Sequence, residues 1–404
     1  MNSIQNFTRM FSLYAFSNII EKGALFLFFV LFARVYGPSS LGQYSYAMAW
    51  ASFVGAIVIL GLDNRAIRDI GSGKYNPTEF LRFSFPLIAV GTSVAFTVWI
   101  LIDRLNGVIR NTEIMFFSIC VSIVLDSLCI LFSSVLRGMQ KMKYHPVINV
   151  IWALSLVLLL SISLANNFTP SDTVMICSIS YLIKFGLYSM AIIEEKIIPS
   201  INSLSFNVVF LRGQITFFVI MALLLLFANY PRIVIEYYLG IEFLGQYSAI
   251  DRIVQAVMLL FVVFDMIIYP LLSKYAGSDS VRLVSAYSML MKLLLLISSL
   301  ISFVIVLFSK EIVYLVFGLK YYSSYVLLCS FAPLISASIV GYLNGKMFFV
   351  INKENDLMIM TGIVIICAMI GGLLLIPHWG IYGIIVPNTI AIWVSQVFSY
   401  YYFR

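Results

Sequence analysis

The sequence predicts an all-α integral membrane protein with twelve transmembrane helices in two six-helix bundles. Hydrophobic residues make up 62% of the 404 residues and charged residues only 11%, less than half the usual share of about 25% in a soluble domain. Apolar stretches of about 20 residues, long enough to cross a membrane as a helix, recur from end to end. One short motif also occurs twice, which indicates a duplicated half.

Each apolar stretch is the basis of one predicted span. The first is longer than a secretory signal sequence and contains Glu21 and Lys22, so we expect it to remain in the mature protein. In chain order the predicted spans lie near residues 11–33, 42–62, 83–102, 114–136, 147–165, 173–193, 210–238, 245–269, 285–308, 323–345, 357–376 and 380–402.

The distribution of cations predicts the orientation, because segments rich in Lys and Arg stay on the cytoplasmic side. If the N-terminus is cytoplasmic, few cations lie in the outward segments: Arg34, Arg104, Arg110, Lys310 and Lys320. The inward ends and loops then carry Arg9, Arg65, Arg68, Lys74, Arg82, Arg137, Lys141, Lys143, Lys196, Arg212, Lys274, Arg282, Lys346, Lys353 and Arg404. With an even number of spans, both termini are cytoplasmic.

The repeated motif predicts the domain organisation. Residues 37–45 return 203 positions later as residues 240–248, and Leu41 to Ser45 are identical to Leu244 to Ser248. Six spans separate the copies, so both halves have the same orientation and their pseudo-two-fold axis runs along the membrane normal. Residues 194–206 are the most polar connection near mid-chain. We therefore predict an N-terminal bundle at 1–197 and a C-terminal bundle at 198–404.

Ionisable residues inside the spans are the candidate functional residues, because a charge at the bilayer centre costs about 2.5–3.5 kcal/mol and therefore faces a partner or a wet cavity. Simple pairing is the alternative. Arg232 and Glu236 are one helical turn apart, but adjacent residues such as Asp251 and Arg252 cannot face one another on a helix. The predicted set is Glu21, Lys22, Asp126, Lys184, Arg232, Glu236, Asp251, Arg252, Asp265 and Lys292.

The repeat helps to weigh these two interpretations. The positions 203 residues away from the charged ones are uncharged, for example Phe29 for Arg232 and Met48 for Asp251, so the half-fold itself does not require the charges. Arginine grips a phosphate with two parallel bonds and lysine acts as a point charge. Lys22, Arg232, Arg252 and Lys292 are therefore the predicted substrate-binding residues. Glu21, Glu236, Asp251 and Asp265 are the predicted ion-coupling or charge-tuning residues, while Lys184 and Asp126 stay undecided.

Several other classes of site are disfavoured. The five cysteines all fall inside predicted spans without paired spacing, and the chain has only two histidines, so we expect neither disulfides nor a metal site. No connection between spans is long enough for a soluble catalytic or ATPase domain, and no cofactor is expected. The net charge of +7 follows one side of the membrane, so nucleic acid is not a predicted partner.

Short motifs along nearly the whole chain resemble those of O-antigen and polysaccharide flippases, relatives of the multidrug and toxin extrusion transporters. In the first half these are Ala33-Arg34-Val35-Tyr36-Gly37-Pro38, Leu41-Gly42-Gln43-Tyr44 and Leu60-Gly61-Leu62-Asp63 to Arg68. In the second half they are Pro231-Arg232-Ile233-Val234-Ile235 to Leu239-Gly240, Phe317-Gly318-Leu319-Lys320-Tyr321 and residues 377–383.

The resemblance implies a bacterial inner-membrane protein that moves an undecaprenyl-diphosphate-linked oligosaccharide, such as an O-antigen unit for lipopolysaccharide, to the periplasmic leaflet by alternating access. The implied partners are that lipid-linked oligosaccharide, membrane lipids and a coupling cation, H⁺ or Na⁺, with contacts to an O-antigen polymerase and a chain-length regulator. Where such families often have an Asp before the Arg of the seventh span, this chain has Pro231.

Two alternatives stay open. A multidrug exporter of the same superfamily would use its acidic residues to bind organic cations. A membrane-embedded glycan polymerase or ligase would be expected to carry a long periplasmic loop with catalytic groups, and the sequence has none. We therefore predict a transporter and not an enzyme.

Overall fold

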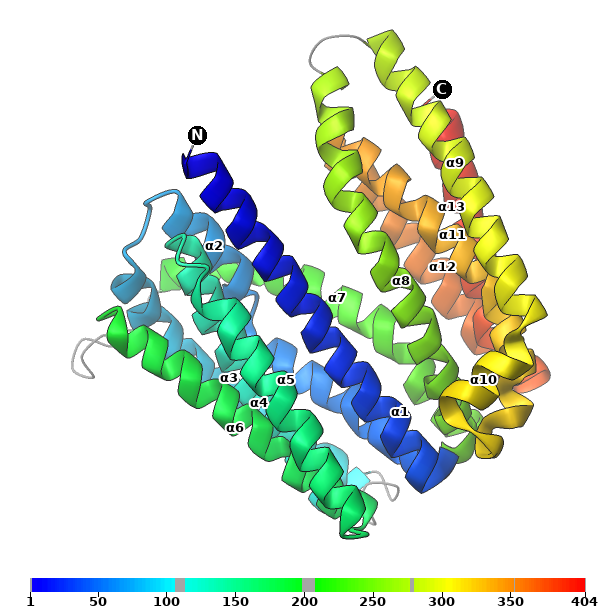
Figure 1. The fold of residues 1–404 in the computed structure, drawn as a ribbon, viewed down its shortest axis with the longest axis horizontal. Helices are drawn as coiled ribbons and strands as arrows, with labels where there is room; N and C mark the ends of the chain where they lie inside the picture. Colours follow the sequence, from blue (N-terminus) through cyan, green and yellow to red (C-terminus); the bar gives the residue numbers. More distant parts are fainter. Residues whose placement is uncertain (1, 106–112, 198–207, 277–279, 352, 404) are drawn as a thin grey trace. The chain divides into compact units, whose positions relative to one another are not determined.

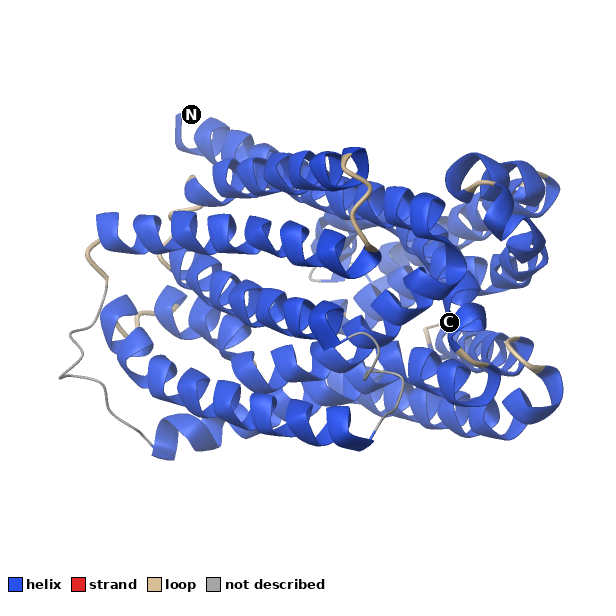
Figure 2. Cartoon of the chain, turned by 90° about the horizontal axis from the view of Figure 1, so that it is seen from below, coloured by secondary structure: helices blue, strands red, loops and turns tan. Residues whose placement is uncertain are grey.

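The computed structural model describes residues 2–105, 113–197, 208–276, 280–351 and 353–403. Within these ranges the regular structure is helical and contains no strand (Figure 2). This confirms the predicted all-α class. The chain divides into two compact units, which are Met1–Val35 with Gln43–Asn229 and Tyr36–Gly42 with Tyr230–Arg404.

The first unit is a bundle in which α6 packs against both α4 and α5, and α2 packs against α4 (Figure 1). Its core contains large side chains with almost no exposed surface, such as Phe116, Trp152 and Tyr188. Its helices are α1 (Asn2–Ile59), α2 (Leu62–Gly71), α3 (Pro77–Leu105), α4 (Glu113–Gly138), α5 (Tyr144–Ala165) and α6 (Pro170–Glu194).

The second unit is built around α11, which packs against α8, α9 and α13, while α12 runs along α13 (Figure 1). It begins within α7, because α7 belongs to the first unit up to Asn229 and to the second from Tyr230. The helices are α7 (Val208–Leu239), α8 (Ile241–Ala276), α9 (Ser280–Leu307), α10 (Ser309–Phe317), the 3₁₀ helix η3 (Leu319–Ser324), α11 (Tyr325–Val350), α12 (Glu354–Trp379) and α13 (Tyr382–Tyr402).

Eight of the twelve predicted spans lie inside one of these helices, and the other four extend one to three residues beyond theirs. The first two spans correspond to the two halves of α1. By length and composition, eight helical segments of the described part are able to cross a membrane. The chain is therefore a multi-pass membrane protein, whereas the count of twelve and the side of the termini stay predictions. The predicted boundary between 197 and 198 borders residues outside the described ranges, so it also stays a prediction.

The surface of α9 shows what solvent these helices meet. Large apolar side chains recur along one stripe at helical spacing and are about half exposed or more: Leu293, Leu296, Leu300, Phe303 and Leu307. An apolar patch of this length is unfavourable in water and favourable against hydrocarbon. The stripe is therefore the face that α9 presents to lipid.

Local sequence explains one helix start and two breaks in the helical path. At the start of α6, Thr169 lies in an extended conformation, its Oγ1 accepts the backbone N–H of Asp172 at 3.3 Å, and Pro170 occupies the first helical position, a common helix start. Elsewhere the helical path is broken at Gly37 (φ 84°) inside α1 and at Gly240 (φ 91°) between α7 and α8. Only glycine adopts such angles without strain, and these two glycines are equivalent positions of the repeat.

Candidate functional site

The first group of charged side chains, here called the lysine cluster, lies inside the first unit. Lys184 on α6 donates from Nζ to Asp126 Oδ1 on α4 at 2.8 Å and to Glu21 Oε1 on α1 at 3.3 Å. The side chain of Lys184 is 6% exposed, and those of Glu21 and Asp126 are 16% and 31% exposed. One ammonium group thus faces two carboxylates, which leaves a surplus of one negative charge.

Neutral polar side chains extend the lysine cluster along α5 and α6. Asn149 donates from Nδ2 to Glu21 Oε2 at 2.6 Å, and the same amide nitrogen lies 3.1 Å from Nε2 of His145. The other ring nitrogen of His145 lies 2.8 Å from the hydroxyl of Tyr188 and 3.0 Å from that of Ser133. A continuous hydrogen-bonded chain therefore connects the imidazole to the carboxylates.

An aromatic ring completes the setting of the ammonium group. Lys184 Nζ lies 4.7 Å from the centroid of the Trp152 ring, within the range of a cation–π interaction. Trp152 is 1% exposed, so the ring shields the lysine from lipid. This shielding strengthens the interaction between Lys184 and its carboxylates, because the local dielectric constant is low.

The second group, here called the arginine cluster, lies in the second unit between the end of α7 and the start of α8. Arg232 Nη2 donates to Asp251 Oδ2 at 2.8 Å, and Gln255 Nε2 donates to the same oxygen at 2.8 Å. Arg252 Nη1 donates to Gln255 Oε1 at 3.0 Å. The side chains of Arg232 and Asp251 are 15% and 19% exposed. Arg232 thus contacts the carboxylate directly, and Arg252 is connected to it through Gln255.

Four of the predicted site residues therefore lie in the two clusters: Glu21 in the first, and Arg232, Asp251 and Arg252 in the second. Glu236 is half-buried on α7, one turn after Arg232, whereas Lys22 on α1 and Lys292 on α9 are exposed. The side chain of Asp265 lies outside the described residues. The ion pair that the structure shows for Arg232 is with Asp251 on the next helix.

From the sequence alone the roles of Lys184 and Asp126 stay undecided, and Asn149, His145 and Tyr188 are not among the predicted site residues. A signal for them was present in the spacing. His145 and Asn149 are four residues apart on α5, and Lys184 and Tyr188 are four residues apart on α6, so each pair lies on one helix face. Polar pairs at this spacing inside apolar spans indicate a shared polar interior.

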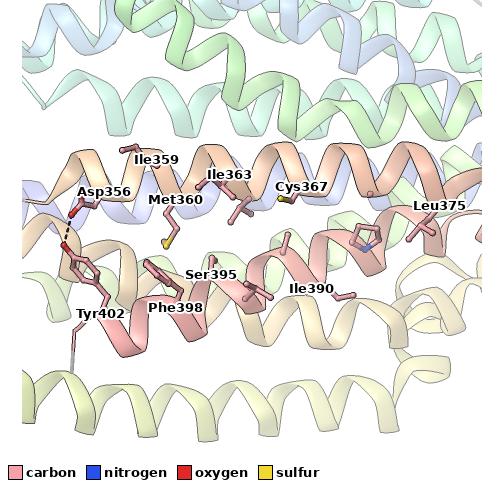
Figure 3. Close-up of a pocket in the computed structure, with 15 residues that line it drawn as sticks. Asp356, Ile359, Met360, Ile363, Cys367, Leu375, Ile390, Ser395, Phe398 and Tyr402 are labelled. Atoms are coloured by element: carbon pink, nitrogen blue, oxygen red, sulfur yellow. Dashed lines mark hydrogen bonds between the residues drawn. The ribbon is translucent and has the colours of Figure 1, made fainter.

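A groove of about 810 Å³ lies between α12 and α13. Apolar residues line nearly all of it, and its polar end is Tyr402, whose hydroxyl donates to Asp356 Oδ2 at 2.6 Å (Figure 3). A groove of this composition, with a carboxylate at its polar end, suits hydrocarbon and not a diphosphate. It does not belong to the candidate charged site.

A third set of charged side chains lies on α2, where its members form ion pairs within that helix. Arg65 and Arg68 are among the cations predicted for the inward ends and loops, and their side stays a prediction. Arg65 is 4% exposed and Asp69 is 2% exposed. The Nε atoms of Arg65 and Arg68 lie 2.9 and 2.8 Å from the two oxygens of Asp69. The carboxylate is thus enclosed between two guanidinium groups that belong to its own helix.

Comparison with solved structures gives the class of the fold. The chain is similar to an inward-facing multidrug resistance MATE family transporter of the MOP superfamily, with a TM-score of 0.76 and 14% identity over 95% of this chain and 94% of the other. It is also similar to the lipid II flippase MurJ in an inward closed conformation, with a TM-score of 0.73 and 13% identity over 96% and 87% of the two chains.

A third similar structure is a MOP superfamily transporter from Pyrococcus furiosus, described as having a binding pocket of reverse polarity. Its TM-score is 0.67 at 14% identity over 98% of this chain and 94% of the other. At these identities the likeness establishes the fold. A comparison with curated proteins finds no match.

The described helices and these likenesses define a multi-pass membrane protein with the fold of MOP superfamily transporters. A family model described as polysaccharide biosynthesis protein matches residues 7–276. The chain belongs to this family, and the resemblance seen in its sequence motifs is confirmed.

Proposed function

We propose that this chain is a flippase that moves an undecaprenyl-diphosphate-linked oligosaccharide, of the O-antigen repeat type, from the cytoplasmic to the periplasmic leaflet by alternating access. A diphosphate and a sugar chain cannot enter hydrocarbon without a large desolvation cost, so the substrate needs a polar route. The proposed location is the bacterial inner membrane, with twelve spans, both termini cytoplasmic and two bundles at 1–197 and 198–404.

The arginine cluster is the observation that carries this proposal. Arg232 donates to the carboxylate of Asp251, and Arg252 is connected to the same carboxylate through Gln255, so two guanidinium groups lie in one hydrogen-bonded cluster. Guanidinium groups bind phosphate oxygens with two parallel, charge-assisted hydrogen bonds. A diphosphate is the part of the proposed substrate that meets this requirement.

The lysine cluster supports a coupling role for a cation. Glu21 and Asp126 face one ammonium group, so the binding of one proton or one Na⁺ would bring this cluster to electrical neutrality. Chains of carboxylate and histidine groups inside a membrane are typical of proton relays. Glu21, predicted to couple an ion, lies in this cluster and hydrogen-bonds to Asn149.

The remaining predicted residues keep their proposed roles. Lys22 and Lys292 would contact the diphosphate or sugar as point charges, and Glu236 and Asp265 would tune the charge of the pathway. The isoprenoid chain would remain in the lipid while the headgroup passes. Contacts with an O-antigen polymerase and a chain-length regulator belong to the same proposal.

Reconstitution of the purified full chain tests this function. Liposomes would contain a fluorescent undecaprenyl-diphosphate-linked sugar, and a membrane-impermeant quencher would report the leaflet that it occupies. We expect protein-dependent flipping, reduced about tenfold or more by Arg232→Gln through loss of one charge-assisted contact, and retained in part by Arg232→Lys. Arg82→Gln, which removes an exposed cation outside both clusters, should leave the rate unchanged.

Two results would contradict the proposal. Export of cationic dyes without movement of the lipid-linked sugar would favour a multidrug exporter, the alternative supported by the likeness to a MATE transporter and by the acidic surplus of the lysine cluster. Formation of a glycosidic bond by the purified chain would show a polymerase or ligase. Accumulation of the lipid-linked unit on the cytosolic face of a deletion strain would support the flippase independently.

A further inference from the structure

The two copies of the repeated motif lie against each other in the structure. The segment Tyr36–Gly42 belongs to the second unit although the chain before and after it belongs to the first. Its partner is the start of α8. A Cβ atom added at Gly42 would overlap the carbonyl oxygen of Ile241, and one added at Gly245 would overlap the carbonyl oxygen of Pro38.

Each copy of the motif makes the same contact with the other copy. Pro38 is equivalent to Ile241 and Gly42 to Gly245, each pair being 203 positions apart. Each glycine therefore lies on the first carbonyl group of the other copy's helix. At these two positions a backbone carbonyl group faces each glycine, so the two helices approach closely. We refer to it as the paired-glycine crossing.

The residues around the crossing have matched environments as well. Leu41 and Leu244 are both fully buried, and Ser45 and Ser248 are each 2% exposed. The hydroxyl groups of Ser45 and Ser248 are buried, and neither has a hydrogen-bond partner among the described residues. Elsewhere in α1, Ser52 donates to the carbonyl oxygen four residues earlier at 2.6 Å.

Two unpartnered hydroxyl groups at equivalent positions indicate that the closed contact is not the arrangement of lowest free energy for these polar groups. A buried hydroxyl without a partner is unfavourable, and a side chain held in an unfavourable state is typical of switch regions. Separation would give both hydroxyls access to water.

We propose that the paired-glycine crossing is a reversible latch, which closes the outer end of the transport pathway when the two motifs meet and opens it when they part. The proposal rests on the proposed function for its transport cycle and on the predicted orientation, which places both motifs at the outer side. The latch requires glycine at both positions, because any larger residue would exclude the closed state.

Cysteine labelling tests the latch without any transported substrate. The Ser248→Cys variant would be made in a chain whose five native cysteines are replaced. Spheroplasts that contain this variant would be treated with a membrane-impermeant maleimide. We expect slow labelling with both glycines present, because Ser248 is buried. Gly42→Ala should raise the labelling rate about tenfold by excluding the closed state and shifting the population to the open one. The mirror pair, Ser45→Cys with Gly245→Ala, should behave in the same way.

Two matched controls separate the latch from general loosening. Gly345→Ala places a methyl group in open space on α11, whereas Gly91→Ala places one 2.5 Å from the carbonyl oxygen of Ile57. Neither should change labelling of Ser248→Cys. The latch is wrong if Gly42→Ala labels no faster than Gly345→Ala, or if Gly91→Ala accelerates labelling equally.

A cross-link tests the latch if the alanine variants do not fold. Ser39 and Glu242 are equivalent in the repeat and both are exposed, so a short flexible bismaleimide should join Ser39→Cys to Glu242→Cys. The joined chain should stop flipping the fluorescent lipid-linked sugar, whereas each single variant capped with a monofunctional maleimide should continue. Normal flipping by the joined chain would overturn the latch. If the uncross-linked chain does not flip the sugar, the proposed function fails and labelling still decides the latch.

Discussion

At the scale of single residues, Lys184 forms ion pairs with two carboxylates at once. Glu21 and Asp126 reach it from α1 and α4, so three helices depend on one charge. Removing one partner of a buried ion pair is strongly destabilising because the other partner is left uncompensated. Replacing the whole group is much less costly.

We predict that Lys184→Met lowers the free energy of unfolding by about 3–5 kcal/mol, the usual cost of breaking a buried ion pair. The triple variant Lys184→Met, Glu21→Gln, Asp126→Asn should recover most of this loss, because no buried charge remains. Thermal unfolding of the purified protein in detergent measures both. A Lys184→Met variant as stable as the wild type would show that the carboxylates are solvated or protonated without the lysine.

Glu195 provides a pH-dependent contact just after α6. Its carboxylate accepts hydrogen bonds from Lys141 and, at 2.8 Å, from Tyr144. The hydrogen bond from Lys141, followed by that from Tyr144, lowers the pKa of Glu195 below its usual value of 4.5. A carboxyl whose folded-state pKa is lowered stabilises the folded state above its unfolded-state pKa, and this stabilisation is lost as the pH falls through the folded-state pKa.

We therefore predict that Glu195→Gln is less stable than the wild type at pH 7 and that the difference narrows as the pH falls below 4.5 and through the lowered folded-state pKa. Melting curves between pH 7 and pH 3.5 measure this difference. Glu113→Gln, which changes a carboxyl at the start of another helix, is the control and should show no convergence of this kind. A constant difference across the range would contradict the assignment.

At the scale of elements, α2 shows how a short helix is held between two spans. Its charged residues enclose Asp69, and the backbone carbonyl of Asp69 accepts the N–H groups of Lys74 at 2.9 Å and Tyr75 at 3.3 Å. The same residue thus fixes the helix through its side chain and the following turn through its backbone. The turn and the helix should loosen together.

We predict that Asp69→Asn lowers the free energy of unfolding by about 2–4 kcal/mol, because two charge-assisted hydrogen bonds become weaker and two cations lose their shared anion, one of them already partly screened by water. Hydrogen exchange at Lys74 and Tyr75 should become faster. Glu79→Gln, an exposed change on the next helix, is the control. Unchanged exchange at these amides would show that the turn does not depend on the Asp69 side chain.

Most elements could be predicted from the sequence because length and apolarity determine a membrane helix. No predicted span extends more than three residues beyond its helix, and the breaks at Gly37 and Gly240 fall in the gaps between predicted spans. The short helices α2 and α10 were not predicted. With ten and nine residues, they are too short to show a helical periodicity of polar and apolar residues within an apolar sequence. Their positions depend on contacts with neighbouring helices.

The candidate site was predictable in part. Helical geometry indicated that Glu21 and Asp251 need partners on other helices, and the structure shows Lys184 for the first and Arg232 for the second. Sequence could not choose these partners, because pairing between distant helices depends on how the bundle packs. The neutral members Asn149 and Tyr188 carry no charge to mark them in an otherwise apolar span.

At the scale of the whole molecule, the anionic diphosphate of the proposed substrate predicts a dependence on membrane voltage. An inside-negative potential favours outward movement of an anion by about 2.3 kcal/mol per charge for each 100 mV. Flipping of the fluorescent lipid-linked sugar should therefore accelerate when a potassium diffusion potential makes the side of entry negative. The potential of the opposite sign should slow it.

Protein-free liposomes under both potentials are the control for this measurement. A rate that does not respond to either potential would show that charge movement is balanced, for example by a cation that travels with the substrate. In that case the lysine cluster would carry a compensating charge in the same direction. The Glu21→Gln variant would then restore a voltage response.

The paired-glycine crossing also restricts how this duplicated gene can diverge. At most helix contacts a bulky replacement on one side is accommodated by a smaller residue on the other, so the two positions drift together. Here the obstacle facing Gly42 and Gly245 is a main-chain oxygen, which every amino acid possesses. No substitution at a second position removes this oxygen. We therefore expect both glycines to stay unchanged even where the rest of the two copies has diverged.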